Sequence, residues 1–357
     1  MIIDEETPLR HRLDERLQYQ SQASELSTNS GGGDTDERRL HDHHDRPKWI
    51  FCILPPGHMF LILVAFLYGT LNVSLRMVYA EPGPPTASAL SCTRGWLALV
   101  CFIPFLANQP RSDSSSSNNI TPTHSIIPAR PLVHVASELA LWNFGAQALL
   151  TLGLESTESA RASFFTQLSV VMTPAISAIA GQTVQSTVWI GCVIALCGLV
   201  LLCDEGGFRL VLSLGDVTVL AGALCWSMYL FRLSAVGEAY NEVRLQGTKT
   251  AFLAVLYSIW VAIEVLFGDV TVSPWPGWKN PITWLLIFYS ALGPGTVADM
   301  VQQKGQATVS ASVANVVLSM EPVFTAILGR IFLGEATTLF DKIGGGLIII
   351  ASVVATR

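Results

Sequence analysis

Residues 307–335 read ATVSASVANVVLSMEPVFTAILGRIFLGE, and this stretch decides the fold. It opens with small residues, continues as an apolar run, and carries the pair Glu321-Pro322 near its middle. Charged residues are costly inside a membrane and usually functional there, while small residues let spanning helices approach closely. Because a proline frees a backbone carbonyl one turn earlier, the stretch predicts a packed, bent helix with a polar centre rather than a plain anchor.

A second stretch, residues 157–182, repeats the same order of features. Small residues lead to Pro174 and then to Gly181, just as Gly329 follows Pro322. The two prolines and the two glycines are each separated by 148 residues. Two marks at one offset indicate an internal duplication, and membrane carriers often bind their substrates where such repeats meet.

The composition indicates a membrane domain that follows a polar tail. Half of the residues are hydrophobic and only 13% are charged, which is about half the share found in soluble proteins. Residues 1–48 hold 7 Lys/Arg and 11 Asp/Glu with few apolar residues, so we expect a disordered tail there. The sequence has no dense basic patch, which argues against binding of nucleic acid.

Ten apolar segments follow the tail, most of them close to the ~20 residues that a helix needs to cross a bilayer. They are His58–Tyr79, Thr86–Leu106, Leu132–Leu154, Ser159–Ala180, Thr187–Cys203, Gly215–Val236, Arg244–Phe267, Pro281–Val301, Thr308–Phe332 and Phe340–Thr356. We therefore expect an all-α membrane protein with ten transmembrane helices. The placement of Lys and Arg near the segment ends predicts that both termini lie in the cytosol.

Several marks make the membrane domain resemble the drug/metabolite transporter superfamily, and in particular its EamA-type repeat, over about residues 58–356. The second segment of each half carries an early arginine, Arg94 and Arg244. The other marks are the aromatic-small pairs Tyr68-Gly69 and Trp226-Ser227 at an offset of 158, Gly215-Asp216, SMEPVFTAILGRIFLGE, and Ile343-Gly344.

The resemblance implies a carrier of small organic metabolites that works by alternating access. It also implies two inverted five-helix repeats, residues 58–203 and 215–356. The first repeat has Thr173 before its proline, where the family often has glutamate. The resemblance therefore implies an asymmetric site.

Polar and aromatic residues inside the segments are the candidates for a substrate-binding cavity. They are Asn72, Trp142, Asn143, Gln147, Arg161, Gln167, Tyr229, Asp299, Asn315 and Glu321. For a single Asn or Gln, the alternative explanation is a hydrogen bond between helices. For Arg161 and Glu321 we prefer a functional role, with Glu321 central and either hydrogen-bonded or paired with a cation such as Arg161.

A secondary transporter is the leading interpretation, and two other classes of function compete with it. A membrane-embedded acyl or lipid transferase predicts a clustered nucleophile or a His/Asp pair at a membrane face, which the sequence does not indicate. A non-transporting scaffold or sensor would not need a duplicated proline–glycine helix. We expect no catalytic residue, cofactor or metal. The expected partners are a small-molecule substrate and the lipid bilayer, and a homodimer stays open.

Overall fold

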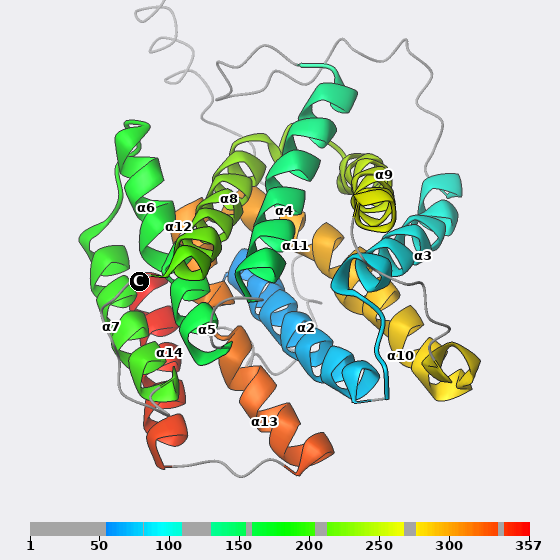
Figure 1. The fold of residues 1–357 in the computed structure, drawn as a ribbon. Coiled ribbons are helices and arrows are strands. Elements are labelled where there is room, and N and C mark those ends of the chain that lie inside the picture. Colours follow the sequence, from blue (N-terminus) through cyan, green and yellow to red (C-terminus); the bar gives the residue numbers. More distant parts are fainter. Residues whose placement is uncertain are drawn as a thin grey trace, which may run out of the picture. The chain divides into compact units, whose positions relative to one another are not determined.

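The computed structural model describes residues 55–80, 82–108, 130–154, 159–203, 213–267, 276–334 and 339–357. The predicted tail, residues 1–48, lies outside them. All the secondary structure in the described residues is helical, as the sequence predicts (Figure 1). The helices are α2 (Pro56–Tyr79), α3 (Ala87–Ala107), α4 (Leu132–Leu154), α5 (Ser159–Gln167), α6 (Ser169–Ile179), α7 (Ser186–Cys203), α8 (Leu214–Val236), α9 (Glu242–Phe267), η1 (Pro276–Lys279), α10 (Pro281–Ser290), η2 (Ala291–Val297), α11 (Ala298–Thr308), α12 (Ala311–Leu318), α13 (Glu321–Leu333) and α14 (Leu339–Ala355).

Each of the ten predicted segments contains helix, but the lengths differ. Among the described residues, six helical stretches are long and apolar enough to cross a membrane. They are Pro56–Tyr79, Ala87–Ala107, Leu214–Val236, Glu242–Phe267, Pro281–Thr308 and Ala311–Leu333. Three shorter apolar helices accompany them, at Phe164–Ile179, Ser186–Leu201 and Lys342–Ala355. These helices are those of a multi-pass membrane protein. They do not establish that the number of spans is ten.

The predicted end of the eighth segment lies before the end of the helix in the structure. The predicted segment is Pro281–Val301. The helix instead continues from α10 through the π-helical turn η2 and α11 to Thr308. Gln302 and Gln303 beyond the predicted end are buried inside the protein, so a polar run marks a protein-facing part of the helix rather than its exit from the membrane.

The ninth predicted segment is broken rather than bent. Helix α12 ends at Leu318 and α13 begins at Glu321, with Pro322 in the first turn of α13. A proline at this place costs no hydrogen bond, because the first N–H groups of a helix have no partner within it. The predicted bend at Pro322 is therefore a change from one helix to the next, and it places the Glu321 carboxylate at a helix start.

Helices of the first half pack against helices of the second. α3 packs along α9, α7 along α14, and α6 against α12 (Figure 1). Two further pairs also join the halves: α4 packs on α8, and α11 packs on α2. The two halves therefore interlock, and side chains from both of them meet in the middle of the bundle.

Matching glycines lie at two of these crossings. A Cβ atom added to Gly153 on α4 would lie 3.0 Å from the carbonyl oxygen of Gly215 on α8. A Cβ atom added to Gly305 on α11 would lie 3.1 Å from the carbonyl oxygen of Gly57 on α2. Gly57 and Gly215 are separated by 158 residues, the offset of the aromatic-small pairs. The internal duplication therefore has a counterpart in the packing, where small residues let the helices touch.

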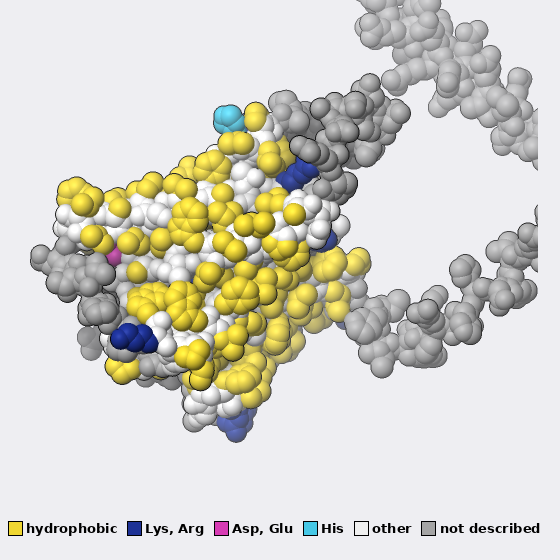
Figure 2. Space-filling view, turned by 90° about the vertical axis from the view of Figure 1, so that its right-hand side faces the viewer, with side chains coloured by type: hydrophobic (Ala, Val, Ile, Leu, Met, Phe, Trp, Pro, Cys, Tyr) yellow, Lys and Arg dark blue, Asp and Glu magenta, His cyan; other side chains and the backbone are white. Residues whose placement is uncertain are grey.

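The outer surface of the bundle is apolar. Large hydrophobic side chains such as Leu63, Val100 and Ile103 are exposed on it. Figure 2 shows one face covered mostly by hydrophobic side chains, with the Lys and Arg side chains in view toward its margins. Such a surface suits contact with lipid tails rather than with water.

Candidate functional site

A cavity of about 330 Å³ lies where the two halves meet. Helices α2, α3 and α4 of the first half and α8, α9 and α11 of the second all contribute to its wall. This volume falls at the lower end of the range of pockets for small molecules. The polar and aromatic residues of the wall are Tyr68, Asn72, Ser91, Arg94, Asn143, Gln147, Thr166, Gln167, Ser169, Trp226, Thr250, Tyr257, Asp299, Asn315, Ser319 and Glu321.

The structure brings most of the candidate residues to this cavity. Those in its wall are Asn72, Asn143, Gln147, Gln167, Asp299, Asn315 and Glu321. Trp142 instead packs against the apolar cluster around Leu139. Tyr229 is fully buried and stacks on the ring of Trp226, which lines the cavity. The side chain of Arg161 is not among those described, so its suggested pairing with Glu321 also lies outside them.

Glu321 faces the cavity from the first turn of α13. Asn72 on α2 donates from Nδ2 to its Oε1 at 2.8 Å and to Thr325 Oγ1 at 3.2 Å. The positive end of the α13 dipole also favours a carboxylate at this place. Among the described residues, the other carboxylate oxygen of Glu321 has no hydrogen-bond partner. It is thus available to a polar group inside the cavity.

Asn315 joins the two repeats. Its Nδ2 donates to Thr173 Oγ1 at 2.7 Å, and both residues are buried. Thr173 and Glu321 stand before the corresponding prolines of the two repeats. The repeats therefore differ at this place, with a neutral helix-to-helix hydrogen bond in one and a carboxylate facing the cavity in the other.

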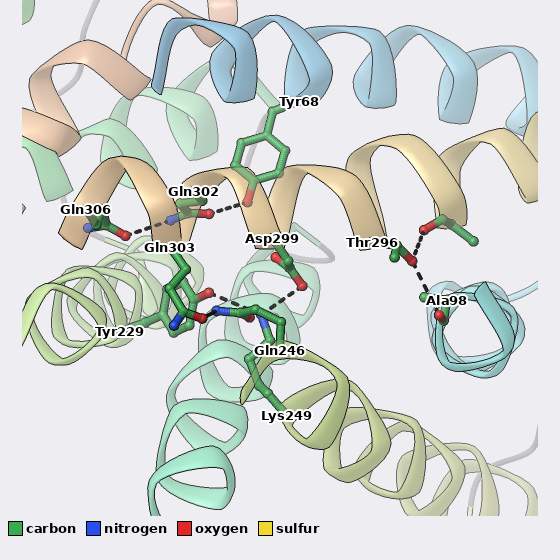
Figure 3. Close-up of polar contacts among 11 residues, drawn as sticks. Tyr68, Ala98, Tyr229, Gln246, Lys249, Thr296, Asp299, Gln302, Gln303 and Gln306 are labelled. Atoms are coloured by element: carbon green, nitrogen blue, oxygen red, sulfur yellow. Dashed lines mark hydrogen bonds and ion pairs between the residues drawn. The ribbon is translucent and has the colours of Figure 1, made fainter. Parts of the chain in front are cut away.

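A buried ion pair, missed in the sequence, supports the part of the wall that contains Asp299 (Figure 3). Lys249 on α9 lies 2.8 Å from Asp299 Oδ2, measured from its Nζ, and donates to the hydroxyl of Tyr229 at 3.1 Å. The Lys249 side chain is fully buried, whereas that of Asp299 is 13% exposed and lines the cavity. Lys249 therefore neutralises, from behind the wall, a carboxylate that faces the cavity.

The sequence carries one signal for Lys249, its match with a cation of the first half. Arg244, the early arginine of the second half that was matched with Arg94, is exposed at the start of α9. The buried cation of this helix is Lys249, and Thr248-Lys249 matches Thr93-Arg94. The correspondence between Arg94 and Arg244 was thus wrong, because an early position in a helix does not decide which side faces the bundle.

Arg94 is a second cation at the cavity, noted in the sequence but not among the candidate site residues. Its Nε donates to Ser290 Oγ on α10 at 3.0 Å. Within the described part of the chain, its terminal nitrogens have no hydrogen-bond acceptor, and no carboxylate lies within 4.0 Å of them. Arg94 therefore presents free N–H groups to the cavity.

Four buried glutamines lie on the two helices that carry Asp299 and Lys249 (Figure 3). We call Gln246, Gln302, Gln303 and Gln306 the glutamine layer. Tyr68 donates from its hydroxyl to Gln302 Oε1 at 2.6 Å, and Gln302 Nε2 donates to Gln306 Oε1 at 3.2 Å. Gln246 Nε2 donates to Gln303 Oε1 at 3.0 Å. The layer thus connects α2, α9 and α11 through their side chains.

The glutamine layer also fastens α11 to the end of α8. Gln303 Nε2 donates to the carbonyl oxygens of Gly237 and Tyr240 at 3.0 and 2.9 Å. Gln306 Nε2 donates to Ser234 Oγ at 3.1 Å. These buried amides close the bundle on the side where α8 and α11 end and α9 begins.

Two ion pairs add to the closure at the same end. Arg232 on α8 binds both carboxylate oxygens of Glu138 on α4, at 2.5 and 3.0 Å. Lys304 on α11 lies 2.9 Å from Glu242 at the start of α9, measured from Nζ to Oε1. Both pairs are partly exposed, so they depend on the salt concentration more than the buried layer does.

Comparison with known proteins adds independent findings. The model of the EamA-like transporter family matches residues 55–203 and 213–357. A protein of Archaeoglobus fulgidus described as an uncharacterized transporter is 22% identical over 297 residues, covering 83% of this chain and 84% of that protein. The uncharacterized transporter YyaM of Bacillus subtilis is 22% identical over 222 residues, covering 60% and 69%. A solved crystal structure shares the fold with a TM-score of 0.65, at 16% identity over 84% of this chain and 96% of that one.

Proposed function

The chain belongs to the EamA-like transporter family, and from this premise we propose that it is a secondary transporter that moves a small organic metabolite by alternating access. The observation that carries the proposal is the cavity between the halves, which both of them line with polar side chains, while the glutamine layer joins α8, α9 and α11 at one end of the bundle. In this proposal the ten helical segments span the membrane as two inverted repeats, with both termini and the glutamine layer on the cytosolic side.

A difference between equivalent helix pairs supports the alternating-access part. α8 and α11 are joined by the hydrogen bonds of Gln303 and Gln306. The equivalent helices of the first repeat are α2 and α4, and the cavity lies between them, lined by Asn72 and Leu75 on one side and by Gln147 and Leu150 on the other. In a carrier built from inverted repeats, exchanging these two arrangements would separate α8 from α11 and bring α2 and α4 together.

The chemistry of the glutamine layer suits a gate that opens and closes in each transport cycle. Its side chains are neutral amides, and water can replace each of their hydrogen bonds when the layer opens. A neutral hydrogen bond contributes only about 0.5–1.5 kcal/mol net. A few such bonds can hold the closed state without locking it.

Transport by the reconstituted protein tests the proposal. The purified chain goes into liposomes preloaded with an unlabelled metabolite panel, and uptake of each labelled member is followed over time. We expect counterflow of at least one member, above that of protein-free liposomes. Absence of uptake for every member would contradict transport.

A pair of matched variants on α2 tests the route. Leu71 lines the cavity, whereas Leu63 is exposed on the outer surface. Leu71→Trp fills the cavity and is expected to stop the counterflow, whereas Leu63→Trp is expected to leave it intact. Equal uptake by the two variants would show that the solute does not pass through this cavity.

A further inference from the structure

We propose that the transported solute carries a carboxylate and that Arg94 is the residue that binds it. This inference rests on the proposed function, since it names the chemical class of the solute that the same cavity takes. It follows from a comparison of the two repeats at the level of single side chains, which shows one cation with a partner and the other without.

The first step is that Arg94 and Lys249 occupy equivalent places. Thr93-Arg94 and Thr248-Lys249 lie in the second long helix of their repeats, 155 residues apart. These helices, α3 and α9, pack against each other. Each repeat therefore supplies one cation from its second helix, with Arg94 in the cavity wall and Lys249 behind the wall.

The second step is that only one of the two cations has a carboxylate. Lys249 is paired with Asp299, six residues before Gly305 on α11. The equivalent glycine of the first repeat is Gly153 on α4, and six residues before it stands Gln147. Gln147 lines the cavity, but a neutral amide cannot balance a guanidinium. The first repeat therefore has the cation without its counter-ion.

The third step is the unused hydrogen-bonding capacity of Arg94. Ser290 accepts from its Nε at 3.0 Å, and the terminal nitrogens have no acceptor among the described residues. A charged group at membrane depth is costly unless it is paired. The planar fork of a guanidinium matches the two oxygens of a carboxylate, which can accept two parallel hydrogen bonds from it. A solute carboxylate thus supplies what Gln147 does not.

The charges around the cavity favour a solute with one negative charge over a solute with two. Lys249 already balances Asp299, and Glu321 adds a further carboxylate to the wall. Arg94 is thus the one cation of the described wall without a carboxylate partner. With Glu321 ionised, these four charges sum to zero, so a monocarboxylate leaves one net negative charge in the cavity and a phosphate ester with two negative charges leaves two.

Matched acid and amide probes test this assignment on the wild-type protein. Labelled hydroxy, keto and amino monocarboxylic acids are offered to proteoliposomes, each with its unlabelled primary amide as competitor, and labelled amides, amines and phosphate esters are offered separately. We expect uptake of at least one acid, with its amide competing roughly ten- to a hundredfold more weakly because a charge-assisted bidentate pair is lost. Uptake of amides, amines or phosphate esters with no acid transported would overturn the assignment while leaving transport itself established.

Variants of Arg94 give the second readout. Arg94→Gln should abolish uptake of the acid, whereas Arg94→Lys should keep part of it, because the charge remains without the fork. Arg244→Gln is the matched control, since Arg244 is exposed on α9, and it should transport normally. A monodisperse Arg94→Gln protein with wild-type uptake of the acid would overturn the assignment. If Arg94→Gln does not fold, the acid–amide competition on the wild type decides, and no uptake of any probe would contradict transport itself.

Discussion

Substituting either partner of the buried pair Lys249–Asp299 should destabilise the protein by several kcal/mol. The loss should differ according to which partner is removed. Removing one partner of a buried pair costs about 3–5 kcal/mol, because the other charge is left without compensation. The two partners differ in burial: the Lys249 side chain is fully buried, whereas that of Asp299 is 13% exposed toward the cavity. The stranded charge is thus fully enclosed in one variant and partly hydrated in the other.

This difference gives an order for three variants. Asp299→Asn strands the enclosed ammonium and should cost about 5 kcal/mol, whereas Lys249→Met leaves a carboxylate that cavity water can reach and should cost about 3 kcal/mol. The double variant, Lys249→Met with Asp299→Leu, removes both charges. It should be more stable than either single variant, since an apolar pair of similar size often replaces a buried ion pair without loss.

The assay is the free energy of unfolding of the purified chain in mixed micelles, measured by titration with a denaturing detergent. The double variant separates pair energetics from simple loss of packing, because the effects of independent sites would add. If the double variant loses as much stability as the two single variants together, the pair is not coupled. If Lys249→Met is the more damaging single change, the reasoning from burial is wrong.

Three further predictions concern the packing, the site and the tail. Gly305→Ala should destabilise the protein by about 1–3 kcal/mol through overpacking, because its Cβ would lie 3.1 Å from the Gly57 carbonyl oxygen. Gly346→Ala is the control, since no atom lies within 4 Å of its new Cβ. In the same titration it should be neutral or stabilising. Glu321→Gln keeps the shape and removes the charge, so we expect near-normal folding with uptake lost; uptake at the wild-type rate would make Glu321 a structural residue. Deleting residues 1–46 should leave detergent-extracted protein monodisperse in size-exclusion chromatography, and aggregation would show that the tail takes part in the fold.

Much of the fold could be predicted from the sequence, because apolar length and the spacing of small residues act locally. The resemblance to the EamA-type repeat is confirmed by the family match over both halves, and the all-helical prediction by the described helices. The end of α11 could not be found this way. Gln302 and Gln303 do not extend the apolar run of the segment, and only their hydrogen-bond partners on other helices make burial of the amides favourable.

The candidate site was predicted in part for a related reason. Asn72, Gln147 and Glu321 are polar residues in apolar segments, a pattern that points inward, and they do line the cavity. The role of Lys249 depends on Asp299, 50 residues further along the chain, and no local pattern announces such a pairing. The break before Glu321 was also hidden, since a proline is compatible both with a bent helix and with the first turn of a new one.

The most direct test of the central claim is to lock the glutamine layer and measure transport. An added Cβ at Gly237 would lie 3.5 Å from Cγ of Gln303, so cysteines at these two positions come within reach of a disulfide between the end of α8 and α11. In a background whose native cysteines are replaced and which still transports, each single cysteine variant should be active. The double variant should lose uptake on oxidation and regain it on reduction, because alternating access needs this end to open. Full uptake by protein whose disulfide is verified by mass spectrometry would contradict the account.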